Sequence, residues 1–473
     1  MKQSRTLALV AMLAASVLGG CNNFLTGDKL NTNPNKPTAA TADQLFIGVQ
    51  VAVMGQWETY PMNLLPLWVQ QIAGVNRQWA TYSDFSSGTD NLTSDAMWNA
   101  FYDAGGLADI RRGEHAANDA GNQREVGQFR VLEALYMGTA ADLWGDVPYD
   151  SAGTAFPKFD AQADVYAHVQ AVLDSAINDL SGAGNGAGVD FYFGGDFDKW
   201  TAVAHTLKAR FYMHTAEKAD LSYDNTILQN VLSETAQGIS SVDGSLATQH
   251  TQNNLEQNLF YQFLVGSRKG DVEPAALHIN LAKQFNDQVL LAQLYAKNGS
   301  GDYVGSPPGF SIGSTVSNFA IAPDYSMGIV TYSENLLLDA EARYRLGDTG
   351  AGGQAADDLN LERTAYGESG SAVIPSGTNG LLVGILEEKY VRNFLNPEVY
   401  FDYLRTCVPN LPLPVGHTAA FNYIPSRFSY GYTESTTNTA NIPADPVANA
   451  NWPKHATGPA GVTCAGQVNR PAS

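Results

Sequence analysis

Apolar residues recur at helical spacing through several long segments of this chain, and this pattern constrains the fold more than any other feature. In the clearest segment, one helical face carries Phe129, Leu132, Tyr136, Ala140 and Leu143. Comparable stripes run through residues 165–180, 200–211, 332–344 and 385–395. Each stripe indicates a helix that buries one face against a core. The sequence therefore predicts a mainly α fold with little β structure.

Long stretches rich in Gly, Pro and Ser separate the helical segments, at residues 181–198, 300–325, 366–380 and 411–473. Loops of this length are usually functional, so we expect them to supply the ligand-binding surface while the helices act as a scaffold. Asn396 can cap a new helix that has Pro397 at its first position. We expect one domain over residues 43–473, built of tetratricopeptide-like helical hairpins and loop-rich from about residue 411.

The N-terminus has the form of a lipoprotein signal. Lys2 and Arg5 precede a short apolar run that ends in Leu18-Gly19-Gly20-Cys21. Leu three positions before the cysteine and Gly directly before it match a lipoprotein cleavage site. The alternative is an ordinary signal peptide followed by an incidental cysteine. We expect residues 1–20 to be removed and Cys21 to carry an acyl anchor in the lipid bilayer.

Residues 21–42 are rich in Asn, Thr and Pro and are expected to form a tether. Thr41 or Asp43 is expected to cap a first helix that extends to about Met54. No later stretch of sequence is long and apolar enough for a transmembrane helix. We therefore expect the protein to be anchored to a membrane without crossing it.

The charge balance excludes one class of partner. The formal net charge is −20, and the predicted signal peptide contains Lys2 and Arg5 but no acid, so the mature chain is more acidic still. A negative field of this size repels phosphate backbones, so we expect no nucleic-acid partner and favour a neutral ligand. Cys407 and Cys464 remain after the signal. They either form a disulfide in an oxidising compartment or stay as two separate thiols.

The densest aromatic and polar cluster outside a clear helical pattern lies between residues 76 and 85. It contains Asn76, Arg77, Trp79, Tyr82 and Phe85. Aromatic rings pack on the C–H faces of sugars, and Arg and Asn hydrogen-bond to the hydroxyl groups, so these residues are ligand-binding candidates. The alternative is that Trp79 and Phe85 pin a loop to the core.

Tyr303 and Phe310, in the 300–325 loop, are further ligand-binding candidates with the same alternative. Trp57, Tyr60 and Trp68 are expected to pack the first helices. The eight His residues show no metal-ligand spacing, so we expect neither a metal site nor a cofactor.

Six short motifs follow one another in a fixed order. They are WGDVPY at 144–149, FDKW with LKAR at 197–210, the segment 284–305, ENLLLDAEARYRLG within 332–347, KY with DYLRT at 389–406, and IPSRFSY with a later Glu and Asn at 424–438. In this order and behind a lipoprotein signal, they resemble the SusD/RagB family of nutrient-binding outer-membrane lipoproteins, in particular its shorter-motif branch. Three positions depart from the usual pattern: Gln288 stands in place of Pro, Val289 in place of Arg, and Leu404 in place of another Arg.

The resemblance implies a helical fold of tetratricopeptide-like hairpins with loops on one side. It also implies a function: surface capture of an oligosaccharide or other polymer fragment, in partnership with a SusC-like TonB-dependent outer-membrane transporter. Binding rather than catalysis is the expected activity, at the outer membrane.

Two other classes of function remain open on the sequence. One is a helical polysaccharide-degrading enzyme, which needs two carboxylates at a set separation. Glu133, Asp142 and Asp146 could supply such a pair, although Glu133 and Asp142 are expected on the exposed side of their helix. The other is a structural or adhesive surface lipoprotein.

Overall fold

The computed structural model describes residues 40–60, 62–83, 91–103, 105–218, 222–377, 379–412, 414–415, 424 and 427–443. The predicted signal peptide, Cys21, most of the tether, Phe85 and Cys464 lie outside these residues, so the predictions about them stay predictions. Cys407 is buried and disulfide-bonded. Its partner lies outside the described residues, and pairing with Cys464 stays a prediction. No helix in the described part of the chain is long and apolar enough to cross a membrane.

Helix α3 spans Ala42–Glu58 and begins where the sequence indicates. Thr41 Oγ1 accepts a hydrogen bond from Gln44 N, and Gln44 Oε1 accepts one from Thr41 N, which forms a capping box. Thr41 is therefore the N-cap, and Asp43 lies in the first turn. The helix continues beyond the expected end at Met54.

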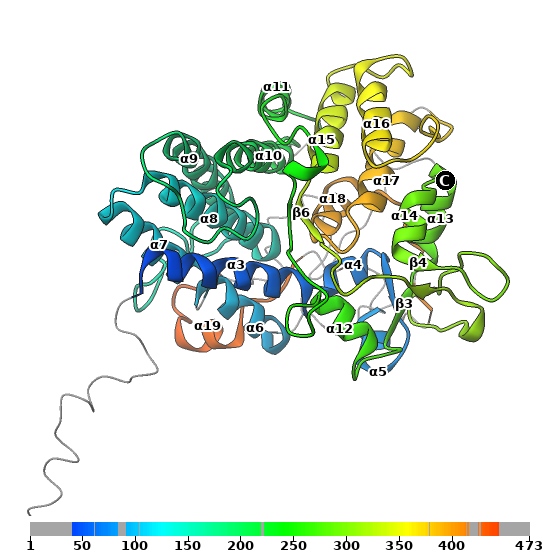
Figure 1. The fold of residues 1–473 in the computed structure, drawn as a ribbon, viewed down its shortest axis with the longest axis horizontal. Coiled ribbons are helices and arrows are strands. Elements are labelled where there is room, and N and C mark those ends of the chain that lie inside the picture. The colour runs from blue at the N-terminus through cyan, green and yellow to red at the C-terminus, as the bar shows by residue number, and fades with distance from the viewer. Residues whose placement is uncertain are drawn as a thin grey trace, which may run out of the picture.

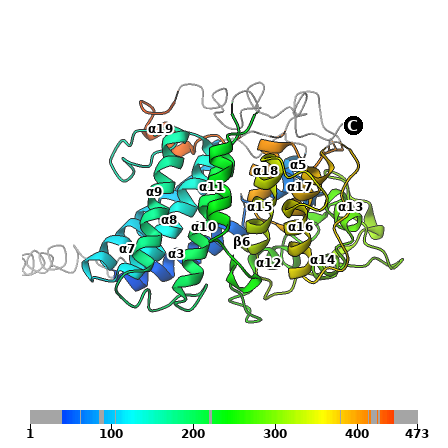
Figure 2. The same ribbon diagram turned by 90° about the horizontal axis from the view of Figure 1, so that it is seen from above.

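Most of the remaining long helices form a continuous arc in which each packs on the next (Figures 1 and 2). They are α7 (Leu107–Asp119), α8 (Gln123–Trp144), α9 (Gln162–Leu180), α10 (Phe197–Thr215), α11 (Asn225–Thr235), α15 (Tyr332–Arg345), α16 (Gln354–Ala365), α17 (Gly380–Arg392) and α18 (Glu398–Thr406). Helix α11 packs on α15 although residues 236–331, which contain three shorter helices and five short strands, separate them in sequence. The mainly α fold of helical hairpins is confirmed.

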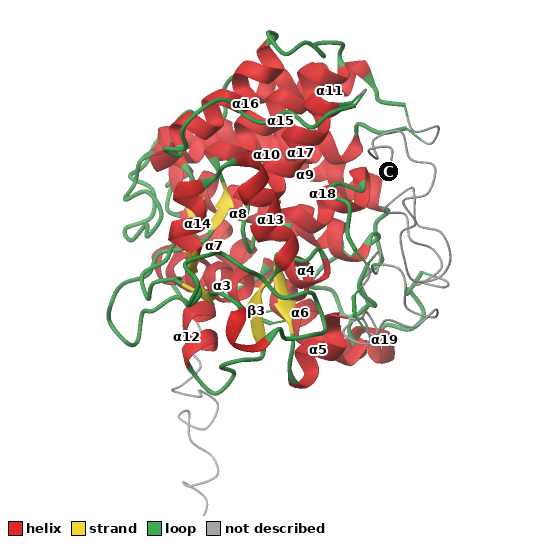
Figure 3. Cartoon of the chain, turned by 90° about the vertical axis from the view of Figure 1, so that its right-hand side faces the viewer, coloured by secondary structure: helices red, strands yellow, loops and turns green. Residues whose placement is uncertain are grey.

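Shorter elements lie outside this arc, and the strands are few and short (Figure 3). The helical ones are α4 (Leu64–Trp68), α5 (Arg77–Ser83), α6 (Asn91–Tyr102), α12 (Leu259–Val265), α13 (Ala276–Phe285), α14 (Gln288–Leu294), α19 (Tyr432–Thr437) and the 3-10 turns η1 (Val242–Gly244) and η2 (Gly313–Thr315). Three antiparallel strand pairs tie distant segments together: β1 (Ile72–Gly74) with β3 (Val272–Pro274), β2 (Leu246–Ala247) with β6 (Gly328–Val330), and β4 (Tyr295–Ala296) with β5 (Asn318–Phe319).

The predicted stripe on α8 is fully buried, from Phe129 to Leu143. Helix α8 ends at Trp144, and Gly145 has a φ of 80°, a conformation that glycine adopts without strain. The stripe predicted over residues 385–395 is helical only in part, because α17 ends at Arg392, and α18 begins at Glu398. The prediction of Asn396 as the cap and Pro397 as the first helical residue is wrong by one position, because Pro397 is the N-cap of α18 and Glu398 its first residue. Asn396 Oδ1 still accepts a hydrogen bond from Glu398 N at 3.0 Å.

The charged residues of the sequence motifs meet inside the helical arc as buried ion pairs. Arg210 of the LKAR motif holds Glu334 through two hydrogen bonds of 2.5 and 2.6 Å. Arg405 of the DYLRT motif holds Glu341 in the same way, at 2.6 and 2.5 Å. All four side chains are buried. The motifs therefore join helices α10, α15 and α18 to one another.

His214 lies in the same network, with Nδ1 2.9 Å from Asp142 Oδ1 and Nε2 2.9 Å from Glu398 Oε1. Burial by itself would lower the pKa of His214, but the two carboxylates outweigh it and raise the pKa to about 10. His214 is therefore a buried cation at neutral pH, and it links α8, α10 and α18.

Candidate ligand-binding site

The candidate cluster at residues 76–83 is held in place by a contact from far along the chain. Strand β1 pairs with β3, and Arg77, which follows β1, donates from Nε to Asp271 Oδ1 at 2.5 Å. Asp271 is fully buried, whereas the Arg77 side chain is 44% exposed. Arg77 also has a φ of 50° and begins helix α5. The expectation that these residues lie outside a helix is therefore wrong.

Trp79 is buried and only 3% exposed. Its ring contacts Phe263 at 5.0 Å between centroids, in an edge-to-face arrangement, and Tyr60 and Tyr82 also pack against it. The prediction that Trp79 presents a face to a ligand is corrected, because three aromatic rings cover the indole. Trp79 instead belongs to the hydrophobic core, as the alternative interpretation held for it.

Tyr60 and Tyr82 form a stacked pair over Trp79. Their ring centroids are 5.7 Å apart at an interplanar angle of 22°, and their hydroxyl oxygens are 3.2 Å apart. Tyr60 is 40% exposed and Tyr82 is half-buried. Tyr60 was expected in the core with Trp57 and Trp68, and that prediction is wrong for Tyr60 alone. The sequence did contain an indication that Tyr60 lies outside the first helix. Pro61 follows Tyr60 directly, and a proline favours the end of a helix just before it.

Polar groups lie beside this pair. Asn76 is exposed and accepts a hydrogen bond from Arg77 N through Oδ1. Arg268 donates from Nη1 to Gln78 Oε1 at 3.0 Å and lies 3.4 Å from the second oxygen of Asp271. Gln78 and Arg268 were not singled out from the sequence, because nothing in their local pattern distinguishes them from other surface residues. We call Tyr60, Tyr82, Asn76, Arg77 and Gln78 the aromatic platform.

The 300–325 loop adjoins the same strands. Gly309 N donates to Gly74 O of β1 at 2.9 Å, so the backbone next to Phe310 lies against the strand that leads into the platform. Phe310 is 53% exposed. Tyr303 is half-buried and has the Lys297 ammonium 5.4 Å above its ring. The structure thus joins the backbone of the second candidate region to the first, while the ligand-binding roles of Tyr303 and Phe310 stay predictions.

The three acids of the enzyme alternative are all engaged in the structure. Asp142 is 1% exposed, binds His214, and accepts a hydrogen bond from Tyr166 at 2.5 Å. Glu133 is buried and accepts from Arg111, and Asp146 accepts from a backbone N–H. Glu133 and Asp142 were expected on the exposed side of their helix, and that expectation is wrong because α8 is covered by neighbouring helices on several sides. The enzyme alternative loses the residues on which it was based.

The platform combines exposed aromatic rings with a fixed cation and amide groups. Rings of this kind pack on C–H groups, while amides and guanidinium groups hydrogen-bond to hydroxyls. The arrangement can therefore bind a segment of a polyhydroxylated polymer, and none of these residues provides a nucleophile or an acid–base pair.

Comparisons with known proteins agree with this architecture. Residues 34–431 match the SusD-like family described as starch-binding and associating with the outer membrane. Among curated proteins, a comparison finds no significant match.

Solved structures share the fold. One, described as a chitin-binding protein, is 22% identical over 85% of this chain and 95% of its own, with a TM-score of 0.72. A chitin-binding SusD homologue from Flavobacterium johnsoniae is 18% identical over 89% and 97% of the two chains, with a TM-score of 0.67. A SusD/RagB family protein from Bacteroides thetaiotaomicron is 19% identical over 85% and 95%, with a TM-score of 0.66. The match over most of the sequence, together with the shared fold, shows that this chain belongs to the SusD-like family.

Proposed function

We propose that the protein is a lipid-anchored outer-membrane binding protein that holds a glycan chain on the aromatic platform and delivers it to a SusC-like TonB-dependent transporter. The observation that carries the proposal is the Tyr60–Tyr82 stack, in which Tyr60 is 40% exposed and Tyr82 lies on the same helix α5 that the exposed Arg77 begins, in a SusD-like protein. The chitin-binding descriptions of two structural relatives support a glycan as the ligand class. The family's description supports the outer membrane as the location. Binding without catalysis is the proposed activity.

A pull-down on insoluble chitin and on starch tests the platform, with soluble oligosaccharides of each used to measure affinity. We expect the wild-type protein to bind one of these polymers and Tyr82→Ala to lose at least about tenfold in affinity, as expected when a central aromatic contact is removed. The melting temperature of Tyr82→Ala should fall by no more than a few degrees, because the side chain is only half-buried and packs on the outer side of Trp79.

Phe191→Ala is the matched control, since Phe191 is 39% exposed and lies in a different loop. It should bind as the wild type does. Unchanged binding by Tyr82→Ala, or equal losses in both variants, would remove the platform from the proposal.

The transporter role needs a separate experiment. The lipidated protein is purified from its native membrane in mild detergent, and co-purifying proteins are identified by mass spectrometry. A stoichiometric TonB-dependent barrel supports the role, and a monomer that yields no barrel after cross-linking refutes it. Loss of membrane association in a Cys21→Ser variant would support the acyl anchor, and retention would argue against it.

A further inference from the structure

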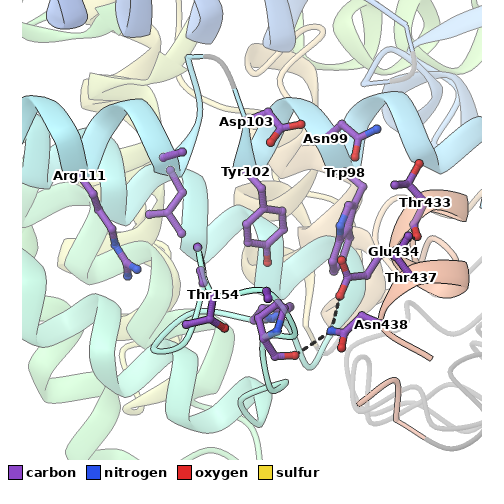
Figure 4. Close-up of a pocket in the computed structure, with 17 residues that line it drawn as sticks. Trp98, Asn99, Tyr102, Asp103, Arg111, Thr154, Thr433, Glu434, Thr437 and Asn438 are labelled. Atoms are coloured by element: carbon purple, nitrogen blue, oxygen red, sulfur yellow. Dashed lines mark hydrogen bonds between the residues drawn. The ribbon is translucent and has the colours of Figure 1, made fainter. Parts of the chain in front are cut away.

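A pocket lies between α6, α7, α19 and the loop at residues 148–157 (Figure 4). It has a volume of about 330 Å³, within the range of small-molecule sites. None of the platform residues lines it. The pocket is therefore a separate feature that the proposed function does not use.

A buried phenol points into the middle of this pocket. In Figure 4 the Tyr102 ring lies between Trp98 on one side and Arg111 on the other. Its hydroxyl oxygen is buried and has no hydrogen-bond partner in the described part of the chain. Burial raises the pKa of Tyr102 well above its usual value, and the charge of Glu434 raises it further, so the hydroxyl stays neutral and keeps its proton. A buried hydroxyl without a partner carries a cost that a bound ligand would remove.

Glu434 of α19 provides a fixed acceptor in the same pocket. Asn438 donates from Nδ2 to Glu434 Oε1 at 2.6 Å and to Pro157 O at 2.7 Å, which ties α19 to the 148–157 loop (Figure 4). These contacts hold one carboxylate oxygen of Glu434 and orient the group at the pocket wall. The pocket therefore offers a donor at Tyr102 and an acceptor at Glu434.

The charged, hydrogen-bonding and apolar side chains that line the pocket indicate which class of ligand it can bind. Asp103 and Glu434 oppose an anion, and the cation in the pocket lining, Arg111, is paired with Glu133 at 3.3 Å. An ammonium group has no lone pair to accept the proton of Tyr102, so it would leave that donor without a partner. A hydroxyl both donates and accepts, so it can satisfy Glu434 and Tyr102 together. Apolar surface from Trp98, Leu107 and Pro148 can pack against C–H groups.

We propose that this pocket binds one neutral polyhydroxylated molecule of monosaccharide size. The inference is independent of the platform, because none of the platform residues lines the pocket and a pocket this small takes a single sugar unit. A hydroxyl group of the ligand donates to Glu434 and accepts from Tyr102, and its carbon skeleton packs on the apolar wall. This site would give the protein a second specificity, for a free sugar.

Ligand-observed NMR titration tests the site with three compounds that differ mainly in charge: glucose, glucosamine and glucose 6-phosphate, with galactose and N-acetylglucosamine as further neutral probes. We expect saturable binding of at least one neutral sugar and weaker binding of the charged pair. Tyr102→Phe should weaken the neutral sugar by about two- to tenfold, the value of one hydrogen bond. The free Tyr102→Phe protein should melt at or above the wild-type temperature, because the change removes a buried hydroxyl that has no partner.

Tyr82→Ala separates this site from the platform. It should leave monosaccharide binding unchanged, and Tyr102→Phe should leave polymer binding unchanged. The inference is overturned if no neutral sugar binds, if a charged analogue binds more tightly, if Tyr102→Phe binds as the wild type does, or if Tyr82→Ala abolishes monosaccharide binding. A drop in the melting temperature of Tyr102→Phe would also overturn it, because the hydroxyl would then have a structural partner.

Discussion

The buried imidazolium of His214 makes the stability of this protein depend on pH in a predictable direction. Both ring nitrogens contact carboxylates at 2.9 Å, and the side chain is fully buried. Replacing it by Gln keeps a hydrogen-bonding group but removes the positive charge. The comparison between wild type and His214→Gln therefore isolates the contribution of that charge.

The size of the effect follows from the raised pKa. In the unfolded chain the pKa is about 6.5, and in the folded protein it is about 10. Each unit is worth about 1.4 kcal/mol, so protonated His214 stabilises the fold by at most about 5 kcal/mol. Because the folded pKa is the higher one, this stability is fully present below about pH 6.5 and is lost as the pH rises to about 10. Burial raises the pKa of Asp142, its partner, and this opposing effect makes 5 kcal/mol an upper bound.

Urea denaturation at several pH values between 6 and 10 measures the free energy of unfolding of both proteins. We expect the advantage of the wild type over His214→Gln to be largest at pH 6 and to shrink by several kcal/mol towards pH 10. His168→Gln serves as a control, because His168 pairs with Asp150 at the surface and such a pair contributes little. A pH-independent difference between wild type and His214→Gln would show that His214 is neutral in the fold, and the reasoning would fail.

Two further substitutions test the packing described above. Trp79→Ala should lower the free energy of unfolding by about 3–5 kcal/mol, because it empties a buried site under the platform, and a loss below about 1 kcal/mol in denaturant titration would contradict its placement in the core. Gly138→Ala should cost about 1–3 kcal/mol, since the added Cβ would lie 2.1 Å from the Phe211 ring. Gly48→Ala on α3 meets no atom within 4 Å and should stabilise by about 0.5–1 kcal/mol, so equal effects of the two glycine changes would contradict the contact with Phe211.

The long helices could be predicted from sequence because one buried face is enough to define each of them. The stripe on α8 and the cap at Thr41 depend on residues only a few positions apart, and both predictions are confirmed. The burial of Glu133 and Asp142 could not be predicted in this way, because it depends on which neighbouring helices cover the polar side of α8. Local patterns identify a helix but not the number of its faces that are covered.

The candidate site was predictable only in part. The structure places exposed polar groups and an aromatic pair around residue 77, and their ligand-binding role stays a proposal. Trp79, predicted to contact the ligand, is buried, and Tyr60, predicted to lie in the core, is 40% exposed. Trp79 is buried because Phe263 covers it, and Arg77 is fixed by Asp271, a residue 194 positions later in the chain. The pocket around Tyr102 was not predicted at all, since Glu434 reaches it from the far end of the sequence.

The ion pairs inside the helical arc change how such an array can come apart. Helical repeats that contact only their neighbours can unfold from the ends, one repeat at a time. Here Arg210 is held by Glu334, 124 positions later, and His214 by Glu398, 184 positions later. Loss of α18 would leave a buried charge in α10 without one of its partners, at a cost of several kcal/mol. Unfolding of α18 at the end of the arc therefore destabilises α10 in its middle. We expect the helices on the two sides of these ion pairs to unfold together.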